Sequence, residues 1–247
     1  MPTLKMKGDT RIMKVYKISN FSIINLRSFG SAPDSEIITS GGIRSYKGQE
    51  PRIKFLELFD KKMVCLEIGV KKGSHACQMY NVLNPSELHL VDIVDKREKN
   101  PELKKLTSRD NVNFLVEDSK KCHSLFPNEF FDFIYIDGNH KYEEVLSDLE
   151  NWVPKVKNGG WITGHDFKFA SHDSEYNKRG FNYCEDGLIL PSNQSGGVAP
   201  AVASYLHKNN IRNLTLYWEG DILKKERKGV SRKKKSGFEF CVHKIFD

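Results

Sequence analysis

The sequence contains no stretch that approaches the roughly 18 uninterrupted apolar residues that a membrane-spanning helix needs. Its basic first 19 residues lack the apolar run of a secretory signal peptide. Cysteine is also scarce, and the five cysteines form no CxxC pair or other metal-binding spacing. An odd, scattered set of cysteines is typical of reduced thiols. We therefore expect a cytoplasmic protein without a membrane span, and the sequence leaves a homo-oligomer open.

The net charge of +7 is concentrated near the C-terminus. Two basic runs lie there, Lys224–Lys228, which includes one glutamate, and Arg232–Lys235. The rest of the chain is close to neutral. A run of like charges is usually a solvated loop. The alternative is a contact for a polyanion, namely nucleic acid, a phosphorylated glycan or an acidic membrane.

Regular hydrophobic patterns begin at Pro51, whereas residues 1–50 show one short apolar stretch, Phe21–Leu26, and no sustained period. We expect an N-terminal extension over residues 1–50 that packs over the active site, and one domain over residues 51–247. The expected strands are Met63–Ile68, Leu88–Asp92, Val112–Val116, Phe131–Ile136, a strand starting at Trp161–Thr163, Leu214–Trp218 and Phe238–Ile245. The expected helices are Ile53–Phe59, Ser74–Leu83, Pro101–Thr107, Ser119–Leu125, Tyr142–Val153 and Ala199–Lys208.

Strands that alternate with helices predict an α/β fold with a doubly wound, mostly parallel sheet of the Rossmann-like type. The last two strands have no helix between them, so we expect an antiparallel hairpin with the basic run at its tip. The segment Lys168–Gln194 is polar and irregular, which is uncommon in a compact domain unless the segment is functional. We expect a lid over an acceptor there, and a disordered loop is the competing interpretation.

A buried strand, a glycine turn and the start of a helix follow one another between Val64 and Ser74. Gly69 allows a sharp turn and Gly73 a close approach to a ligand. Such a ligand would bind at the carboxyl end of the sheet, beside the helix N-terminus at Ser74. The G-x-x-x-G spacing differs from the G-x-G-x-x-G of dinucleotide-binding proteins. Taken alone, the spacing is also compatible with a tight turn that binds nothing.

Polar residues also end the next two expected strands. Asp92 lies about 20 residues beyond the glycines, where an acidic side chain can accept hydrogen bonds from two ribose hydroxyls. Asp118 and Ser119 follow the strand Val112–Val116, where they could meet an adenine amino group, or cap a helix instead. Polar residues at three successive strand ends favour a nucleotide-like ligand.

Three segments resemble class I S-adenosylmethionine (SAM)-dependent methyltransferases. They are Leu66–Ser74, Phe131–Tyr142 with its Asp-Gly-x-His-x-Tyr pattern, and Gly159–Asp166 with its Gly-Gly-x-Ile-x-Gly-His-Asp pattern. The more specific similarity is to the subgroup of macrocin-type sugar O-methyltransferases and cephalosporin-hydroxylase-like proteins, over roughly residues 52–247. The resemblance implies a seven-stranded sheet with a reversed last strand. It also implies SAM contacts at Glu67, Gly69, Asp92, Asp118 and Ser119.

The candidate reaction centre lies at the ends of two neighbouring strands, where Asp137 and the pair His165-Asp166 should meet at the carboxyl edge of the sheet. Carboxylates and an imidazole there can hold a divalent cation that orients a substrate hydroxyl. The resemblance to metal-dependent O-methyltransferases implies Asp137, His165 and Asp166 as metal ligands. It also implies His140 as the general base, which suits an ordinary histidine pKa of about 6.5.

One departure concerns the metal. The family usually has two oxygen donors after this strand, whereas this chain has His165 in the first position, so magnesium or manganese is expected with iron left open. His165 could also be a supporting group, and His140 could make only a local hydrogen bond at a helix start. A site without metal, or with Asp137 and Asp166 as the sole ligands, stays open.

The function that these residues favour is transfer of a methyl group from SAM to a hydroxyl of a sugar, a glycoside or another small molecule, with assistance from a divalent metal. A first alternative is a nucleic-acid methyltransferase that uses the basic hairpin tip. A second is a metal-dependent oxygenase or a binding module on the same fold.

Overall fold

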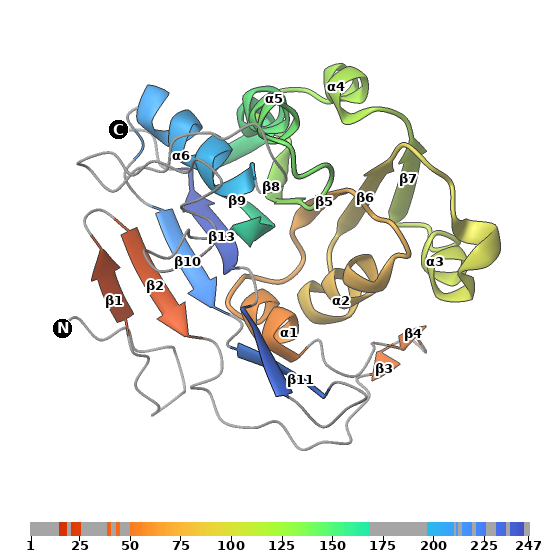
Figure 1. Ribbon diagram of the computed structural model, residues 1–247. Helices are drawn as coiled ribbons and strands as arrows, with labels where there is room; N and C mark the ends of the chain where they lie inside the picture. Colours follow the sequence, from red (N-terminus) through yellow and green to blue (C-terminus); the bar gives the residue numbers. More distant parts are fainter. Residues whose placement is uncertain are drawn as a thin grey trace.

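The computed structural model describes residues 15–18, 21–25, 39–40, 43–44, 50–167, 197–209, 211, 214–218, 221–225, 231–235 and 238–244. It has an α/β architecture in which helices cover both faces of one large twisted sheet (Figure 1). Within the described residues, no helix is both long and apolar enough to cross a membrane.

Nine strands form the main sheet, in the order β1-β2-β10-β13-β9-β8-β5-β6-β7. Its strands are β1 (Val15–Ile18), β2 (Phe21–Asn25), β5 (Val64–Ile68), β6 (Glu87–Asp92), β7 (Val112–Val116), β8 (Phe131–Ile136), β9 (Val156–Phe167), β10 (Leu214–Trp218) and β13 (Phe238–His243). The strands from β5 to β9 are parallel, and β13 runs antiparallel to both β9 and β10. The predicted Rossmann-like sheet with a reversed last strand is confirmed.

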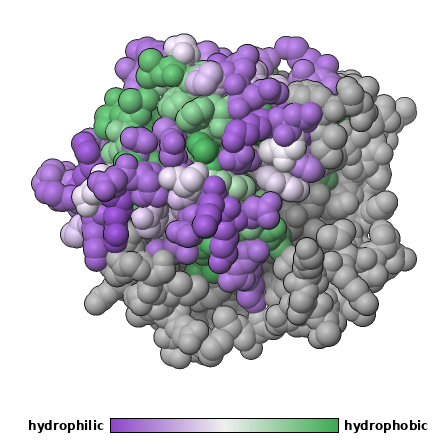
Figure 2. Space-filling view, turned by 180° about the vertical axis from the view of Figure 1, so that it is seen from behind, coloured by the Kyte–Doolittle hydropathy of each residue, from purple (hydrophilic) through white to green (hydrophobic). Residues whose placement is uncertain are grey.

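The helices divide between the two faces of this sheet (Figure 1). The longer ones are α1 (Glu50–Leu56), α2 (Ser74–Leu83), α3 (Pro101–Leu106), α5 (Tyr142–Trp152) and α6 (Val198–Lys208), with the single turn α4 (Ser119–Cys122) and the 3-10 turns η2 (Arg97–Lys99), η3 (His123–Leu125) and η4 (Val153–Lys155). One hydrophobic cluster lies under α5 and α6, and a second lies under α1, α2 and α3. On the face seen in Figure 2, the described surface is mostly hydrophilic.

Strand β8 illustrates why the sequence folds in this way. Its residues form an apolar run that only Asp132 interrupts, and five of the six, including Phe133 and Tyr135, are buried. A strand that is covered by helices on both faces needs such a run, because neither face meets water. At the end of the run the side chains become polar, and Asp137 stands at the carboxyl edge of the sheet.

Three features differ from the expected sheet. Strands β1 and β2 extend it beyond β10, to which β2 pairs in parallel, so the sheet has nine strands where seven were expected. Strand β9 begins at Val156, and Gly159-Gly160 is a bulge inside it where a turn was expected, with Gly159 at a φ of 80°. The N–H of Gly159 donates to the carbonyl of Lys244, which holds the bulge in the sheet.

The expected hairpin is present, since β10 and β13 pair antiparallel. The basic run between them forms a separate two-stranded ribbon of β11 (Asp221–Lys225) and β12 (Ser231–Lys235). Another small pair, β3 (Thr39–Ser40) and β4 (Ile43–Arg44), precedes α1. The whole of the expected lid, Lys168–Gln194, lies outside the described residues. So does most of residues 1–50, and the expectation that this extension packs over the active site stays a prediction.

Candidate active site

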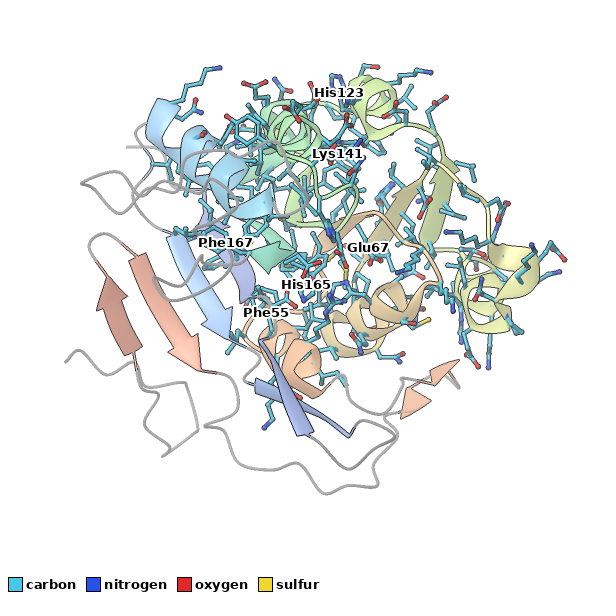
Figure 3. The ribbon with its side chains drawn as sticks, viewed as in Figure 1. Phe55, Glu67, His123, Lys141, His165 and Phe167 are labelled. Atoms are coloured by element: carbon cyan, nitrogen blue, oxygen red, sulfur yellow. The ribbon has the colours of Figure 1, made fainter. Side chains whose placement is uncertain are left out.

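A cavity of about 900 Å³ opens at the carboxyl ends of the parallel strands, where several charged side chains converge. Ten of the eleven residues expected at the site line it, namely Glu67, Gly69, Ser74, Asp92, Asp118, Ser119, Asp137, His140, His165 and Asp166. Figure 3 shows two of them, Glu67 on β5 and His165 on β9, near the centre of the molecule. The topology therefore brings residues from the ends of five strands, β5 to β9, to one cavity.

Gly69 is required by a close approach of two strand ends. It has a φ of 89°, and its N–H donates to the carbonyl of Val91 over 2.9 Å. The N–H of Asp137 donates to the carbonyl of Ile68 over 2.8 Å, so the chain after β8 runs directly against the turn. A Cβ on Gly69 would overlap the carbonyl oxygen of Asp137. Gly69 thus allows the turn after β5 and the chain after β8, which carries Asp137, to lie side by side.

We predict that Gly69→Ala is markedly more harmful than Gly159→Ala. Both glycines have a positive φ, which costs an alanine about 1–2 kcal/mol. A Cβ on Gly159 meets nothing within 4 Å, whereas one on Gly69 collides with the backbone of Asp137. Urea unfolding should therefore show a larger loss of stability for Gly69→Ala, and equal losses in the two variants would contradict the proposed close approach.

Gly73 is the expected site residue that the cavity lining does not include. It has a φ of 79° and caps the N-terminus of α2. A Cβ there would come within 2.8 Å of the Leu103 side chain, so the close approach is to α3. Ser74, the first residue of α2, does line the cavity. Gly73 thus shapes the turn by packing, while its neighbour faces the cavity.

Asp92 is held in place by the backbone of two loops. Its Oδ2 accepts a hydrogen bond from the N–H of Lys71 over 2.7 Å, and its Oδ1 accepts from the N–H of Val94 over 2.9 Å. The carboxylate therefore joins the loop after β5 to the loop after β6. Each oxygen keeps further lone pairs for a ligand, so Asp92 is positioned to receive hydroxyl groups at the cavity wall.

Asp118 and Ser119 separate into two roles. The Asp118 side chain caps α4 by accepting from the N–H of Lys120 over 3.0 Å. The Ser119 hydroxyl donates to Oδ1 of Asp148 on α5 over 2.6 Å. Burial raises the pKa of Asp148 to about 6, and the Ser119 hydrogen bond opposes this shift. Since all three residues line the cavity, this corner offers a ligand the helix-capping carboxylate of Asp118 and the buried carboxyl group of Asp148.

Glu67 on β5 and His75 on α2 form a buried pair on either side of the glycine turn Gly69–Gly73. Oε1 of Glu67 lies 3.2 Å from Nδ1 of His75, whose ring packs against that of Tyr135 at a tilt of 31°, with centroids 3.8 Å apart. Burial raises the pKa of Glu67 well above its usual value, and Asp137 adds to this effect. Burial and nearby Arg52 lower the pKa of His75. Among the described residues, Oε2 of Glu67 and Nε2 of His75 have no hydrogen-bond partner, so a polar ligand in the cavity would satisfy them.

The candidate reaction centre is organised around His140. Its Nε2 lies 3.2 Å from Oδ1 of Asp137, and its Nδ1 lies 3.1 Å from Oδ2 of Asp166. Hydrogen bonds with Asp137 and then Asp166 raise the pKa of His140 to about 9. Asp166 adopts a left-handed backbone with a φ of 60°, which is rare for a non-glycine residue and common at functional sites. The ring therefore joins the ends of β8 and β9.

Arg52 on α1 and Glu239 on β13 form a second set of ion pairs next to this centre. Arg52 on α1 places its Nη2 3.5 Å from Oδ2 of Asp137 and its Nε 3.2 Å from Oε1 of Glu239. Glu239 on β13 is fully buried and accepts a 2.6 Å hydrogen bond from the Tyr135 hydroxyl. His165 lies between the groups, with Nε2 3.9 Å from Glu239 and Nδ1 3.6 Å from Asp166. The network couples strand β13 to Asp137.

The expected metal ligands do not form a preformed metal site. Nδ1 of His165 lies 4.0 Å from Asp137 and 3.6 Å from Asp166, while both carboxylates are engaged by the ring of His140. Within the residues that the structure describes, no group of three or more histidine, cysteine, aspartate or glutamate side chains has a metal-binding arrangement. Asp137, His140 and Asp166 are arranged as a carboxylate–imidazole–carboxylate bridge, and not as ligands around a cation.

Four site residues were missed by the sequence reasoning: Arg52, His75, Asp148 and Glu239. Two of them carry a signal. Glu239 stands alone between two phenylalanines in an apolar strand, and Asp148 occupies a position of the buried stripe of α5 that includes Val145, Leu149 and Trp152. A lone acidic residue in such a pattern indicates a buried charge, which needs a partner. Arg52 and His75 stand in no pattern that distinguishes them.

Part of the chain is similar to known proteins. The model of a methyltransferase domain family matches residues 66–167, which run from β5 to the end of β9. An uncharacterised protein of Sinorhizobium fredii, y4gI, is 37% identical over 41 residues, which are 17% of this chain and 4% of that protein. The chain thus matches only a small part of that relative's length.

Solved structures share the fold over most of the chain. They include a precorrin-6y C5,15-methyltransferase from Geobacter metallireducens (TM-score 0.54, 12% identity, 85% of this chain and 94% of that one). An O-methyltransferase from Bacillus cereus in complex with SAH has a TM-score of 0.50 and 16% identity over 81% of this chain and 83% of that one. A Burkholderia thailandensis 1,6-didemethyltoxoflavin-N1-methyltransferase has a TM-score of 0.50 and 15% identity over 80% and 78%. Residues 66–167 therefore match a methyltransferase domain, and the chain shares the Rossmann-like fold of these solved methyltransferases.

Proposed function

We propose that this protein transfers the methyl group of SAM to a hydroxyl group of a sugar-containing acceptor. The observation that carries the proposal is the bridge of Asp137, His140 and Asp166 in the same cavity as the glycine turn at Gly69. A loop that can bind SAM and a group that can take a proton from an alcohol thus share one space.

The cofactor half rests on three features of the cavity wall. The turn at Gly69 leaves room beside the strand end, and Asp92 offers carboxylate oxygens to two ribose hydroxyls. Ser119 and Asp148 are available to an adenine amino group. Acidic groups predominate near Asp137 and Asp166, which favours the positive sulfonium of SAM over the neutral sulfur of its product. The O-methyltransferase from Bacillus cereus, which shares this fold, was solved with SAH.

The acceptor half concerns proton transfer. The acceptor oxygen attacks the methyl carbon, the carbon–sulfur bond breaks, and its electron pair stays on sulfur. The hydroxyl proton passes to neutral His140, and the imidazolium that forms is stabilised by Asp137 on one side and Asp166 on the other. Arg52 and Glu239 hold Asp137 in position. In-line placement of oxygen, carbon and sulfur supplies the remaining rate enhancement.

The acceptor chemistry can be tested with methyl-labelled SAM and a panel of glycosides, with RNA included. The proposal expects label in a methyl ether, which survives mild base, whereas a methyl ester is hydrolysed. Label only in base-labile or N-linked products would overturn the assignment to a hydroxyl.

Metal assistance, which the family resemblance implies, is not part of this proposal, because the donors are already paired with His140. We therefore predict that dialysis against EDTA leaves the rate of methyl transfer within about twofold of the untreated enzyme, since a metal Lewis acid worth several kcal/mol would be missed far more. A loss of activity that magnesium, manganese or iron restores would show that a cation displaces His140 from the two carboxylates.

A further inference from the structure

Most of the net positive charge of the chain lies in residues 221–235, which include the ribbon β11–β12. Residues 221–235 contain eight basic and two acidic residues, so this segment has a net charge of +6 against +7 for the whole chain. The other residues together are nearly neutral. A charge distribution this uneven creates a local field that attracts polyanions and is screened by salt.

The register of the ribbon places basic residues on both of its faces. In antiparallel strands, directly opposite residues share a face. One face has Leu223 opposite Lys233, Lys225 opposite Ser231 and, at its base, Lys235 opposite the acidic Asp221. The other face has Ile222 opposite Lys234 and Lys224 opposite Arg232. Each face thus carries three basic residues, spaced by about 6.8 Å along a strand.

The topology places the base of this ribbon at the active-site edge of the sheet. Trp218 at the end of β10 pairs with Phe238 at the start of β13, and Phe238 pairs with Phe167, which follows Asp166 directly. The link from Trp218 to Asp221 spans three Cα–Cα steps, at most about 11 Å. In Figure 1 the ribbon is labelled at β11, below α1. Its base is therefore rooted at the same edge as the reaction centre.

These features favour one class of partner. A flat acidic membrane contacts one face of a ribbon and leaves the cations of the other face in water, and a small anion needs a cavity. A flexible single strand of nucleic acid can contact both faces with its phosphates. Because the proposed reaction needs a hydroxyl, RNA fits better than DNA, since every RNA nucleotide carries a 2′-hydroxyl.

We propose that the ribbon β11–β12 binds the phosphate backbone of single-stranded RNA and delivers a ribose hydroxyl to the cavity. The inference deepens the proposed function and rests on it for the choice of RNA over DNA. The ribbon supplies affinity without sequence preference, because phosphate contacts carry no base information.

The test measures fluorescence anisotropy of a labelled 12-nucleotide single-stranded RNA of mixed sequence, without SAM, at several salt concentrations. Each phosphate contact is worth about fivefold in affinity at 0.1 M salt, from a slope of about −0.7 per contact. The triple variant Lys233→Gln, Lys234→Gln and Lys235→Gln should bind about 100-fold more weakly, with a slope smaller by about 2. The matched control changes three exposed lysines on and beside α3, namely Lys99, Lys104 and Lys105, to glutamine and should bind as the wild type does.

Several outcomes would overturn the inference: no RNA binding at 50 mM salt, equal losses in the ribbon variant and the control, or binding to phosphatidylserine vesicles in place of RNA. Methyl transfer from labelled SAM completes the test, with label expected in the RNA and absent from DNA of the same sequence. Label in a glycoside and none in RNA would overturn the choice of acceptor and leave the proposed function standing. SAM affinity of the ribbon variant should be unchanged. Failure of SAM binding in the wild type would overturn the proposed function and with it the delivery of a ribose hydroxyl, whereas the anisotropy measurement tests RNA binding by the ribbon separately.

Discussion

Replacing His140 with asparagine is expected to lower kcat by about 10²–10⁴-fold, the usual contribution of a general base. SAM affinity should stay close to that of the wild type, because His140 contacts the two carboxylates of the reaction centre and not the cofactor loop. Rapid-quench measurement of methyl transfer and titration with SAM would separate the two effects. The control His123→Asn removes a histidine that lies outside the cavity (Figure 3) and should have little effect.

The same residue sets the pH dependence. Its pKa in the folded protein, about 9, lies above the ordinary histidine value, so the proton-accepting neutral form gains population only as the pH rises toward 9. The rate should increase up to that pH and then level off. In Asp166→Asn, which removes one of the two carboxylates, the inflection should move toward 6.5. An inflection that is the same in both proteins would show that another group accepts the proton.

Replacing Glu239 with alanine is expected to lower the free energy of unfolding by about 3–5 kcal/mol, because breaking a buried ion pair leaves a charge without compensation. Glu239 is fully buried, and Arg52, which it holds 3.2 Å away, is only 17% exposed. Urea denaturation measures the loss directly. Without Glu239, Arg52 would lose its buried partner and would no longer hold Asp137 in position. Methyl transfer should therefore fall together with stability.

A graded control is available in the same network. Tyr135→Phe removes the hydroxyl that donates to Glu239 but leaves the ion pair intact. It should cost about 1.5–3 kcal/mol, the value of one hydrogen bond to a charged group. If Glu239→Ala were no more destabilising than Tyr135→Phe, the ion pair with Arg52 would contribute nothing to the fold.

The strands of the sheet could be predicted where a buried strand appears in the sequence as a run of apolar residues. Strands β7, β8 and β10 and helix α2 begin and end where the sequence indicates, because strands covered on both faces and helices bounded by glycine leave clear patterns. The reversed last strand followed from the missing helix. The residues that line the cavity could also be predicted, because parallel strands end at one edge of the sheet and their polar residues meet there.

The rest depends on contacts that local patterns do not record. The stretch Phe21–Leu26 looks like an isolated apolar segment, and its pairing with β10 joins residues almost 200 positions apart. Gly159-Gly160 reads as a turn, because sequence alone does not distinguish a turn from a bulge whose backbone is held by Lys244. His140 was expected as an ordinary histidine beside a metal. Its contact with two carboxylates depends on side-chain conformations at two strand ends.

The central claim is that the cavity beside Gly69 binds SAM through the strand ends. Isothermal titration of SAM into the wild type and two aspartate variants tests it most directly. Asp92→Ala should weaken binding by about 10–100-fold, because it removes a charged hydrogen-bond acceptor worth about 1.5–3 kcal/mol. Asp95→Ala, which removes an exposed partner of Arg97 outside the cavity, should bind like the wild type. Wild-type protein that gives no saturable heat with SAM, or two variants with equal affinity, would contradict the account.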